Sequence, residues 1–282
     1  MIISIASGKG GTGKTTIATN LAFSIGSNVQ ILDCDVEEPN VHLFLNPTIE
    51  KREKVFTLVP KIDKEKCTLC KKCVEICRFN AIIGMGKSIL TFPELCHSCA
   101  GCIEVCPEKA ITEGFRELGE IEIGFFNDIG FVHGRIRIGE AMAPHLIRKV
   151  REYQVADKLN IIDAPPGTSC PVITAVKNTD FVLMVTEPTP FGLHDLKLAI
   201  EAVKILKIPR GLIINRSDIG NDEVREYAKK ENIPIFMEIP FDRKLAEIYS
   251  KGGLIAAYNS EWKEKFRELY NTVKSYQLLR GD

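Results

Sequence analysis

A glycine-rich loop near the start of the chain is the feature that most constrains its fold. Residues 8–16 contain the pattern G-x-x-x-x-G-K-[ST], in which backbone N–H groups surround a polyphosphate and a lysine neutralises its charge. The apolar residues 1–6 predict a buried strand before this loop, and residues 15–25 predict a helix that ends at Gly26. Because the N-terminus of a helix favours anions, the order strand, loop, helix predicts a phosphate site.

The pattern assigns a role to each residue of the loop. Lys14 would neutralise the phosphate charge, and the hydroxyl of Thr15 would hold Mg²⁺. The other residues expected to bind the phosphates are Gly8, Gly10, Gly11, Thr12, Gly13 and Thr16. A flexible glycine turn without a ligand is the alternative, and the strand and helix on either side of the loop disfavour it.

A second lysine in the loop, Lys9, is not required by ordinary phosphate loops. The run of residues 9–16 resembles the deviant Walker A ATPases of the MinD and ParA type, which include the nitrogenase iron protein and the Mrp-like iron–sulfur carriers. This resemblance implies that the ligand is ATP and that the protein forms a nucleotide-dependent homodimer. It also implies that Lys9 reaches across the interface to the nucleotide of the partner subunit, whereas a solvated Lys9 without a role is the alternative.

Composition limits the class of protein. The chain has 282 residues, with 37 Lys and Arg balanced by 37 Asp and Glu, so no long basic surface for nucleic acid is expected. The chain begins in an apolar strand without a basic flank, and no uncharged stretch approaches the roughly 18 residues that span a bilayer. We therefore expect a cytoplasmic protein that does not bind membranes.

Eight of the ten cysteines fall into two blocks of identical spacing, the second 29 residues after the first. The blocks are Cys67, Cys70, Cys73 and Cys77, and then Cys96, Cys99, Cys102 and Cys106. Each has the spacing C-x2-C-x2-C-x3-C of bacterial ferredoxins, in which the fourth cysteine binds the other cluster of the pair. This spacing predicts two [4Fe–4S] clusters, and zinc or disulfides are the alternatives.

The ferredoxin spacing also predicts how the ligands are shared. One cluster would be bound by Cys67, Cys70, Cys73 and Cys106, and the other by Cys96, Cys99, Cys102 and Cys77. We predict an inserted ferredoxin domain of the small α+β kind at residues 62–114. The surrounding residues 1–61 and 115–282 would then form one discontinuous ATPase domain.

Two further apolar runs end in aspartates. Residues 29–35 predict a buried strand that ends at Asp33 and Asp35, and residues 159–163 predict another that ends at Asp163. The family resemblance implies that Asp35 orients the attacking water and helps to hold the magnesium shell, while Asp33 is structural or supports that shell from behind its direct ligands. It implies that Asp163 is the Walker B carboxylate and that Gly167 directs its N–H toward the γ-phosphate. Simple capping and a plain turn are the respective alternatives.

The rest of the chain alternates predicted strands and helices with short connections, which is typical of a doubly wound, mostly parallel α/β sheet of the P-loop NTPase class. The resemblance implies that Asn215 contacts the adenine base and that Pro240 belongs to the segment covering the ring. Aromatic and aliphatic residues recur on one face of the predicted helix 261–276, and their spacing favours a core helix over a membrane anchor.

Together these features predict an ATP-hydrolysing dimer whose ferredoxin domain relays electrons. The nucleotide state would control either electron transfer or the docking of an unidentified redox or metallocluster protein. The expected cofactors are ATP, Mg²⁺ and two [4Fe–4S] clusters. An ATP-switched carrier or assembly factor for metalloclusters is the main alternative, and a positioning ATPase that recruits partners is another.

Overall fold

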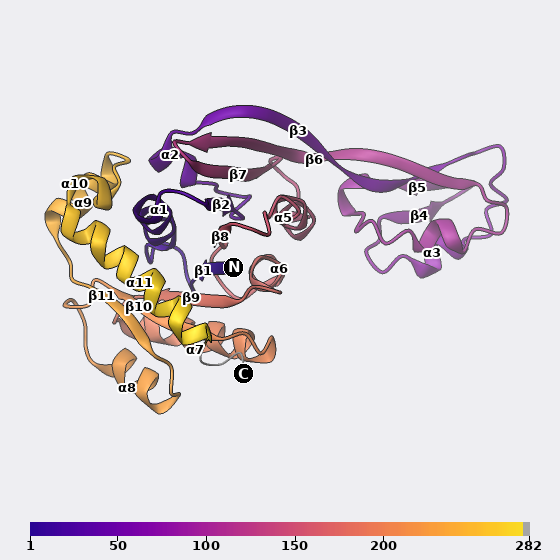
Figure 1. Cartoon of the computed structure of the whole chain (residues 1–282). Coiled ribbons are helices and arrows are strands. Elements are labelled where there is room, and N and C mark those ends of the chain that lie inside the picture. The colour runs from indigo at the N-terminus through magenta and orange to yellow at the C-terminus, as the bar shows by residue number, and fades with distance from the viewer. Residues whose placement is uncertain (279–282) are drawn as a thin grey trace.

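The computed structural model describes residues 1–278 and shows a large body and a small body joined by a long ribbon of strands (Figure 1). The large body is built on a nine-stranded sheet. Its strands, from one edge to the other, are β11 (Ile235–Ile239), β10 (Arg210–Asn215), β9 (Phe181–Thr186), β1 (Ile2–Ala6), β8 (Leu159–Asp163), β2 (Val29–Asp33), β7 (Ile129–Ile136), β6 (Ile111–Phe126) and β3 (Thr48–Ile62).

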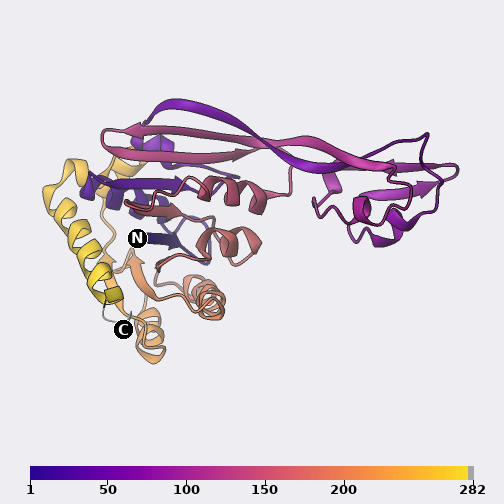
Figure 2. The same ribbon diagram turned by 45° about the vertical axis from the view of Figure 1, so that its right-hand side comes forward.

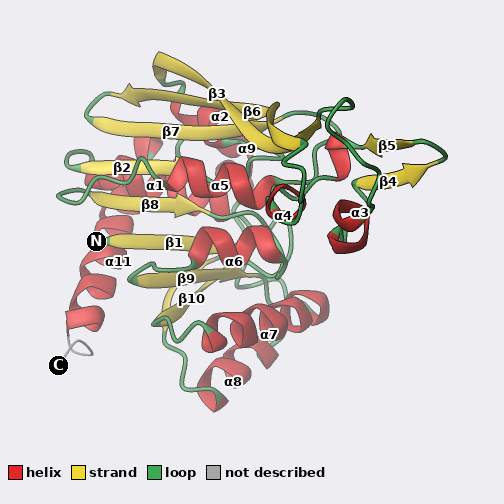
Figure 3. Cartoon of the chain, turned by 90° about the vertical axis from the view of Figure 1, so that its right-hand side faces the viewer, coloured by secondary structure: helices red, strands yellow, loops and turns green. Residues whose placement is uncertain are grey.

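Neighbouring strands from β11 to β7 run parallel, and only β6 is antiparallel to its neighbours β7 and β3. The predicted large, mostly parallel sheet is therefore confirmed. Its central strands are mostly apolar because helices bury both faces, as Figures 2 and 3 show. In β1, for example, Ile3 and Ile5 point into one core and Ala6 into the other.

Each face of the sheet has its own helical layer. One core includes residues of α1 (Lys14–Ile25), α2 (Val41–Leu45), α10 (Ile255–Tyr258) and α11 (Ser260–Leu278). The other includes residues of α5 (Ala143–Arg151), α6 (Cys170–Val176), α7 (Pro190–Ile205) and α8 (Glu223–Lys230). The remaining helix of this body, α9 (Arg243–Ser250), follows β11.

Local sequence signals explain where the helices begin and end. Gly13 precedes α1 with φ +98°, and Gly26 ends α1 with φ +82°, a region of backbone space that favours glycine. At the start of α7 the hydroxyl of Thr189 accepts the N–H of Gly192, and Pro190 occupies the first turn, where no intrahelical N–H bond is lost.

The ribbon is formed by β3 and β6, which are 15 and 16 residues long and pair antiparallel from Thr48–Phe125 to Ile62–Ile111. The small body, residues 63–110, lies at its far end (Figure 1). It contains α3 (Lys72–Ile76), β4 (Ile82–Met85), β5 (Ser88–Thr91), the short helix η1 (Pro93–Leu95) and α4 (Gly101–Glu104).

The insert differs from the predicted 62–114 at its second boundary. The chain leaves the ribbon after Ile62 and rejoins it at Ile111, so residues 111–114 belong to the start of the 16-residue β6. Both bodies therefore share one pair of strands. At the other end of the predicted ATPase domain, residues 279–282 lie outside the described residues.

The last described helix belongs to the core. Trp262, Phe266, Leu269 and Val273 of α11 are buried, and the helix packs on α1. This placement confirms the core reading of its apolar face. Among residues 1–278, no helix has both the length and the apolar character needed to cross a bilayer.

Candidate functional site

The glycine-rich loop connects β1 to α1 and opens onto the main cavity of the large body. Gly11 and Gly13 both have positive φ, and a Cβ added to Gly13 would lie 2.6 Å from Nδ2 of Asn215. This amide donates a hydrogen bond of 2.9 Å to the carbonyl of Thr12, so the end of β10 holds the loop in place. Added Cβ atoms on Gly10 and Gly11 would meet nothing within 4 Å, which leaves the backbone open toward a ligand.

Gly8 has a packing role beside the phosphate contact predicted for it. A Cβ at this position would clash with the backbone carbonyl of Asp195 in α7. Gly8 does not line the main cavity. Its small size therefore allows close packing between the loop and α7, which the phosphate pattern alone does not reveal.

Thr15 and Asp163 meet beneath the loop. The Thr15 hydroxyl donates to Oδ2 of Asp163 at 2.6 Å, while the buried Oδ1 has no hydrogen-bond partner among residues 1–278. Burial raises the pKa of Asp163, although the Thr15 bond and the nearby Lys14 lower it. A hydroxyl beside a carboxylate with an unused oxygen is a donor set that Mg²⁺ prefers, so these residues fit the ion.

The two aspartates at the end of β2 and just beyond it have separate roles. Asp33 accepts the N–H groups of Asn40 and Val41 at 2.9 and 3.0 Å, so it fixes the turn before α2 and is structural. Asp35 lines the cavity and is only half-buried. Burial raises its pKa to about 6, with Lys14 opposing the shift. Asp35 is therefore placed where it can accept a proton from a water molecule.

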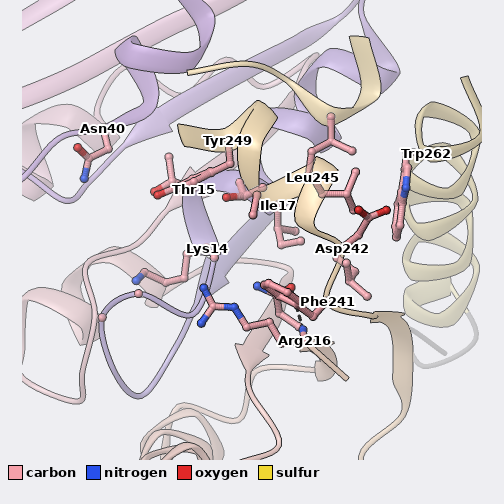
Figure 4. A pocket seen from close by; sticks show the side chains of 18 of the residues that line it. Lys14, Thr15, Ile17, Asn40, Arg216, Phe241, Asp242, Leu245, Tyr249 and Trp262 are labelled. Carbon is pink, nitrogen blue, oxygen red and sulfur yellow. Dashed lines mark hydrogen bonds between the residues drawn. The ribbon is translucent and has the colours of Figure 1, made fainter. Parts of the chain in front are cut away.

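The cavity combines a polar wall and an apolar wall. Figure 4 shows Lys14 and Asn40 on one side and Trp262 of α11 on the other. The predicted residues that line it are Gly10, Gly11, Gly13, Lys14, Thr15, Thr16, Asp35, Asn215 and Pro240. Phe241, Tyr249 and Trp262 also line it, and the sequence reasoning missed them. A flat aromatic and aliphatic wall next to a phosphate loop suits a nucleobase.

Lys9 is engaged within its own chain. Its ammonium lies 3.2 Å from Oε2 of Glu187, and the guanidinium of Arg216 lies 2.8 Å from the other oxygen. The Glu187 side chain is largely buried, whereas Lys9 is partly exposed at the surface. Neither Glu187 nor Arg216 belongs to the sequence pattern, so this bridge between β9 and β10 was not predicted.

Gly167 lies after β8 with φ +97° and donates its N–H to the carbonyl of Ser7 at 3.0 Å. It lines a smaller cavity beside α6 and not the main one. In the single chain, the N–H of Gly167 is therefore directed to the backbone just before the loop.

Thr12 of the loop is held through its backbone. Its carbonyl accepts the hydrogen bond from Asn215, and its buried hydroxyl has no partner among the described residues.

The small body gathers four of the predicted cysteine ligands around one cavity. Cys67, Cys70, Cys73 and Cys106 line it together with apolar residues such as Ile62 and Ile111. The N–H of Ala110 donates to Sγ of Cys106 at 3.3 Å. Within residues 1–278, no three His, Cys, Asp or Glu side chains are placed to hold a single metal ion.

The second cysteine block forms a similar loop. The N–H of Ser98 lies 3.4 Å from Sγ of Cys96, the geometry of an amide donating to a thiolate. The ring of His97 stacks on Phe79 with centroids 3.6 Å apart. Because Phe79 comes two residues after Cys77, this stack brings the end of the first block against the second, which is compatible with the predicted sharing of Cys77. The stack itself was not predicted.

Comparison with known proteins identifies the family of the large body. The family model described as "CobQ/CobB/MinD/ParA nucleotide binding domain" matches residues 3–255. The chain belongs to this family. The uncharacterized protein MJ0578 of Methanocaldococcus jannaschii is 35% identical over 98% of this chain and 97% of its own length.

Two further similarities agree with the family. An iron–sulfur cluster carrier protein of Pyrococcus horikoshii is 25% identical over 99% of this chain and 88% of its own length. The septum site-determining protein MinD of Pyrococcus horikoshii, solved with Mg-ADP, has a TM-score of 0.60 at 20% identity and covers 96% of this chain and 95% of its own. The second similarity establishes the α/β fold.

Proposed function

We propose that this protein binds and hydrolyses ATP as a nucleotide-dependent homodimer and couples its nucleotide state to electron transfer through two [4Fe–4S] clusters. The coupling would control either the transfer itself or the docking of a redox or metallocluster protein. The observation that supports this proposal is that one chain combines a nucleotide-binding family domain with a cavity lined by Cys67, Cys70, Cys73 and Cys106.

The nucleotide site would work mainly by placing charge. Lys14 is buried at the loop, only 7% exposed, and its ammonium would stabilise the negative charge that develops on the phosphates. Thr15 and Asp163 would hold Mg²⁺, which supplies electrostatic stabilisation of the phosphate oxygens when bound. Asp35 would orient the attacking water and accept its proton. Asn215 and Pro240 would contact the adenine base, beside the aromatic wall of the cavity.

The cysteines would hold the clusters in the crossed arrangement. The four around the first cavity would bind one cluster, and Cys96, Cys99, Cys102 and Cys77 would bind the other. Bound clusters would supply one-electron redox chemistry. The ribbon brings the second loop closer to the large body than the first, because Ser98 contacts Leu58 whereas the first cavity adjoins Ile62 at the ribbon's end.

Anaerobic purification followed by iron, sulfide and EPR analysis tests the clusters. The expected result is about eight irons and eight sulfides per chain, from two cubanes. Cys70→Ser should reduce this content, while Cys170→Ser, which changes an exposed cysteine outside the insert, should leave it unchanged. A preparation that holds zinc and lacks sulfide would refute the redox proposal.

Stopped-flow oxidation of the dithionite-reduced protein tests the coupling. We expect the rate of electron transfer to an acceptor to differ between MgATP and MgADP. Lys14→Ala should abolish nucleotide binding and hence this difference. A rate that ignores nucleotide in the unmodified protein would favour the second candidate function.

That second candidate is an ATP-switched carrier or assembly factor for metalloclusters. It is favoured by the similarity to proteins named iron–sulfur cluster carriers. However, the chain has no C-x-x-C outside its insert, so it lacks the paired cysteines that would share a labile cluster between subunits. ATP-dependent transfer of iron and sulfide from the loaded protein to an apo-ferredoxin would support the carrier, and retention of both clusters during ATP turnover would support the relay.

A further inference from the structure

The end of β7 and the residues after it, 134–140, contact the backbone next to Asp35. The N–H of Ile136 donates to the carbonyl of Val36 at 2.9 Å, and Val36 directly follows Asp35. A Cβ added to Gly134 would lie 2.9 Å from Cγ1 of Val36 and 2.8 Å from Cγ2 of Val150. Only glycine allows this close approach, so the end of β7 and the residues after Asp35 are packed as one unit.

The same segment is attached to the ribbon. Arg137 donates its backbone N–H to Leu118 and its guanidinium to the carbonyl of Glu117, at 3.0 and 3.2 Å. Glu140 forms an ion pair with Arg116, and these two side chains are only 7% and 9% exposed. Nε and Nη2 of Arg116 have no hydrogen-bond partner among the described residues. Glu140 therefore provides the main compensation for a buried positive charge.

At this point the ribbon also meets the second cysteine loop. Thr57 is the cross-strand partner of Arg116, and cross-strand partners share one face of a sheet. The Thr57 hydroxyl lies 2.6 Å from the hydroxyl of Ser98, which in turn donates to the carbonyl of Leu58 at 2.7 Å. Ser98 lies between Cys96 and Cys99. Thr57 thus contacts the small body through Ser98, and Arg116 contacts the large body through Glu140.

From this juxtaposition we infer that Arg116 and Glu140 are positioning residues that transmit the nucleotide state at Asp35 to the cysteine loop 96–99. The inference rests on the proposed function. A shift of the residues after Asp35 would move the end of β7 with it, and the Glu140–Arg116 pair would carry this movement to Thr57 and Ser98. The exposed ion pairs of the ribbon are unsuited to this role, because solvent screens them and they hold their partners weakly.

The experiment compares the full-length, cluster-loaded protein with two variants. We measure the EPR spectrum and midpoint potential of each cluster with MgADP and with a non-hydrolysable ATP analogue with Mg²⁺. In the unmodified protein, the signal assigned to the second cluster should differ between the two nucleotides. Glu140→Gln should lose at least half of this difference while nucleotide affinity and iron content stay unchanged. Glu120→Gln is the matched control, because it removes an exposed carboxylate of β6, the strand that carries Arg116, and this carboxylate lies 3.9 Å from Arg135.

Retention of the full nucleotide-dependent difference in Glu140→Gln would overturn the inference. Hydrogen exchange on the unmodified protein gives a test that does not depend on the variant's folding. The ATP analogue should change the exchange of the segments 56–58, 96–99, 116–118 and 136–141 together, and unchanged exchange at 96–99 would also overturn it. The proposed function fails separately, if the unmodified protein holds no sulfide or binds no ATP.

Discussion

Gly10 and Gly13 lie three residues apart in the same loop, yet the structure requires glycine at the two positions for different reasons. Gly13 has φ +98° and no room for a Cβ beside Asn215, whereas the Cβ position of Gly10 is open. We therefore expect Gly13→Ala to lower the free energy of unfolding by about 1–3 kcal/mol, because a non-glycine residue is strained there. Gly10→Ala should change it by less than about 0.5 kcal/mol.

Urea unfolding without nucleotide measures the difference between these variants. Isothermal titration with MgADP then separates stability from binding. Gly10→Ala should weaken binding despite its normal stability, because its added methyl group projects toward the ligand. Equal stability of the two variants would contradict the packing argument at Gly13.

A buried histidine at the base of the ribbon should make stability depend on pH. His133 is fully buried, donates a 2.7 Å hydrogen bond from Nε2 to Oε2 of Glu122, and lies against the ring of His42. Burial lowers its pKa below the ordinary 6.5, against the opposing effect of Glu122. Near pH 6 the unfolded chain therefore binds a proton that the folded chain does not, so stability should rise with pH by up to about 1.4 kcal/mol per pH unit.

Denaturation curves measured from about one pH unit below the ordinary histidine pKa of about 6.5 to about one and a half units above it give this slope. His133→Gln should remove most of it. His145→Gln is the control. Burial also lowers the pKa of His145, but this side chain in α5 is only partly buried. A slope that survives in His133→Gln would assign the effect to other groups.

Residue roles could be predicted where a local pattern carries them. Lys14, Thr15 and Asp35 line the predicted cavity because spacing along one loop or strand end fixes their positions. Glu187 and Arg216 follow other strands, and no local pattern marks a carboxylate that will meet Lys9. Such contacts depend on strand order in the sheet, which a single sequence does not specify.

At the scale of elements, α11 is a helix that both packs in the core and lines the nucleotide cavity. Its buried Phe266 contributes to the core against α1 and lines the base end of the cavity. Phe266→Ala should lower the free energy of unfolding by about 3–5 kcal/mol, because it removes a large buried side chain and leaves a cavity. Thermal unfolding measures the loss, and Lys274→Ala on the same helix should have no comparable effect. If Phe266→Ala has normal stability, the packing of α11 on α1 does not contribute to the free energy of unfolding.

The apolar strands and their following helices could be predicted, but the ribbon could not. The strands β1, β2, β8 and β9 are apolar runs bounded by glycines or acids, so their periodicity marks them. The part of β3 at 50–54 reads Glu-Lys-Arg-Glu-Lys, a run that suggests a solvated loop. It is a strand because its partner β6 supplies the hydrogen bonds and both faces there are largely open to solvent.

At the scale of the whole molecule, the ribbon holds the small body away from the large one, as Figures 1 and 2 show. The strands β3 and β6 connect the two bodies. Thr57 of β3 contacts Ser98 of the small body, and its cross-strand partner Arg116 of β6 contacts Glu140 of the large body. The cysteine loops at the end of this two-stranded arm carry the exposed Cys70 and Cys99. The ribbon makes any influence of the nucleotide on those loops depend on a few contacts at the base of the small body.

Assembly is the property for which Lys9 gives the sharpest prediction. In the single chain its ammonium is held by Glu187, so reaching a partner's nucleotide requires that ion pair to break. Lys9→Ala should therefore lower the rate of ATP hydrolysis at least tenfold at protein concentrations that favour dimers, while its affinity for MgATP changes less than threefold. Lys14→Ala should lose binding itself, because its charge faces the phosphates of its own subunit.

Glu187→Gln breaks the ion pair of Lys9 but keeps the lysine, whereas Lys9→Ala removes the lysine itself. Without the carboxylate, Lys9 should move freely, so dimers should form at lower protein concentration and hydrolysis per subunit should rise at low concentration. Sedimentation velocity with a non-hydrolysable ATP analogue and a concentration series of ATPase rates measure both effects. If Lys9→Ala and Lys14→Ala lose affinity equally, Lys9 acts on the nucleotide of its own subunit, and Glu187 then serves only to orient it in the loop.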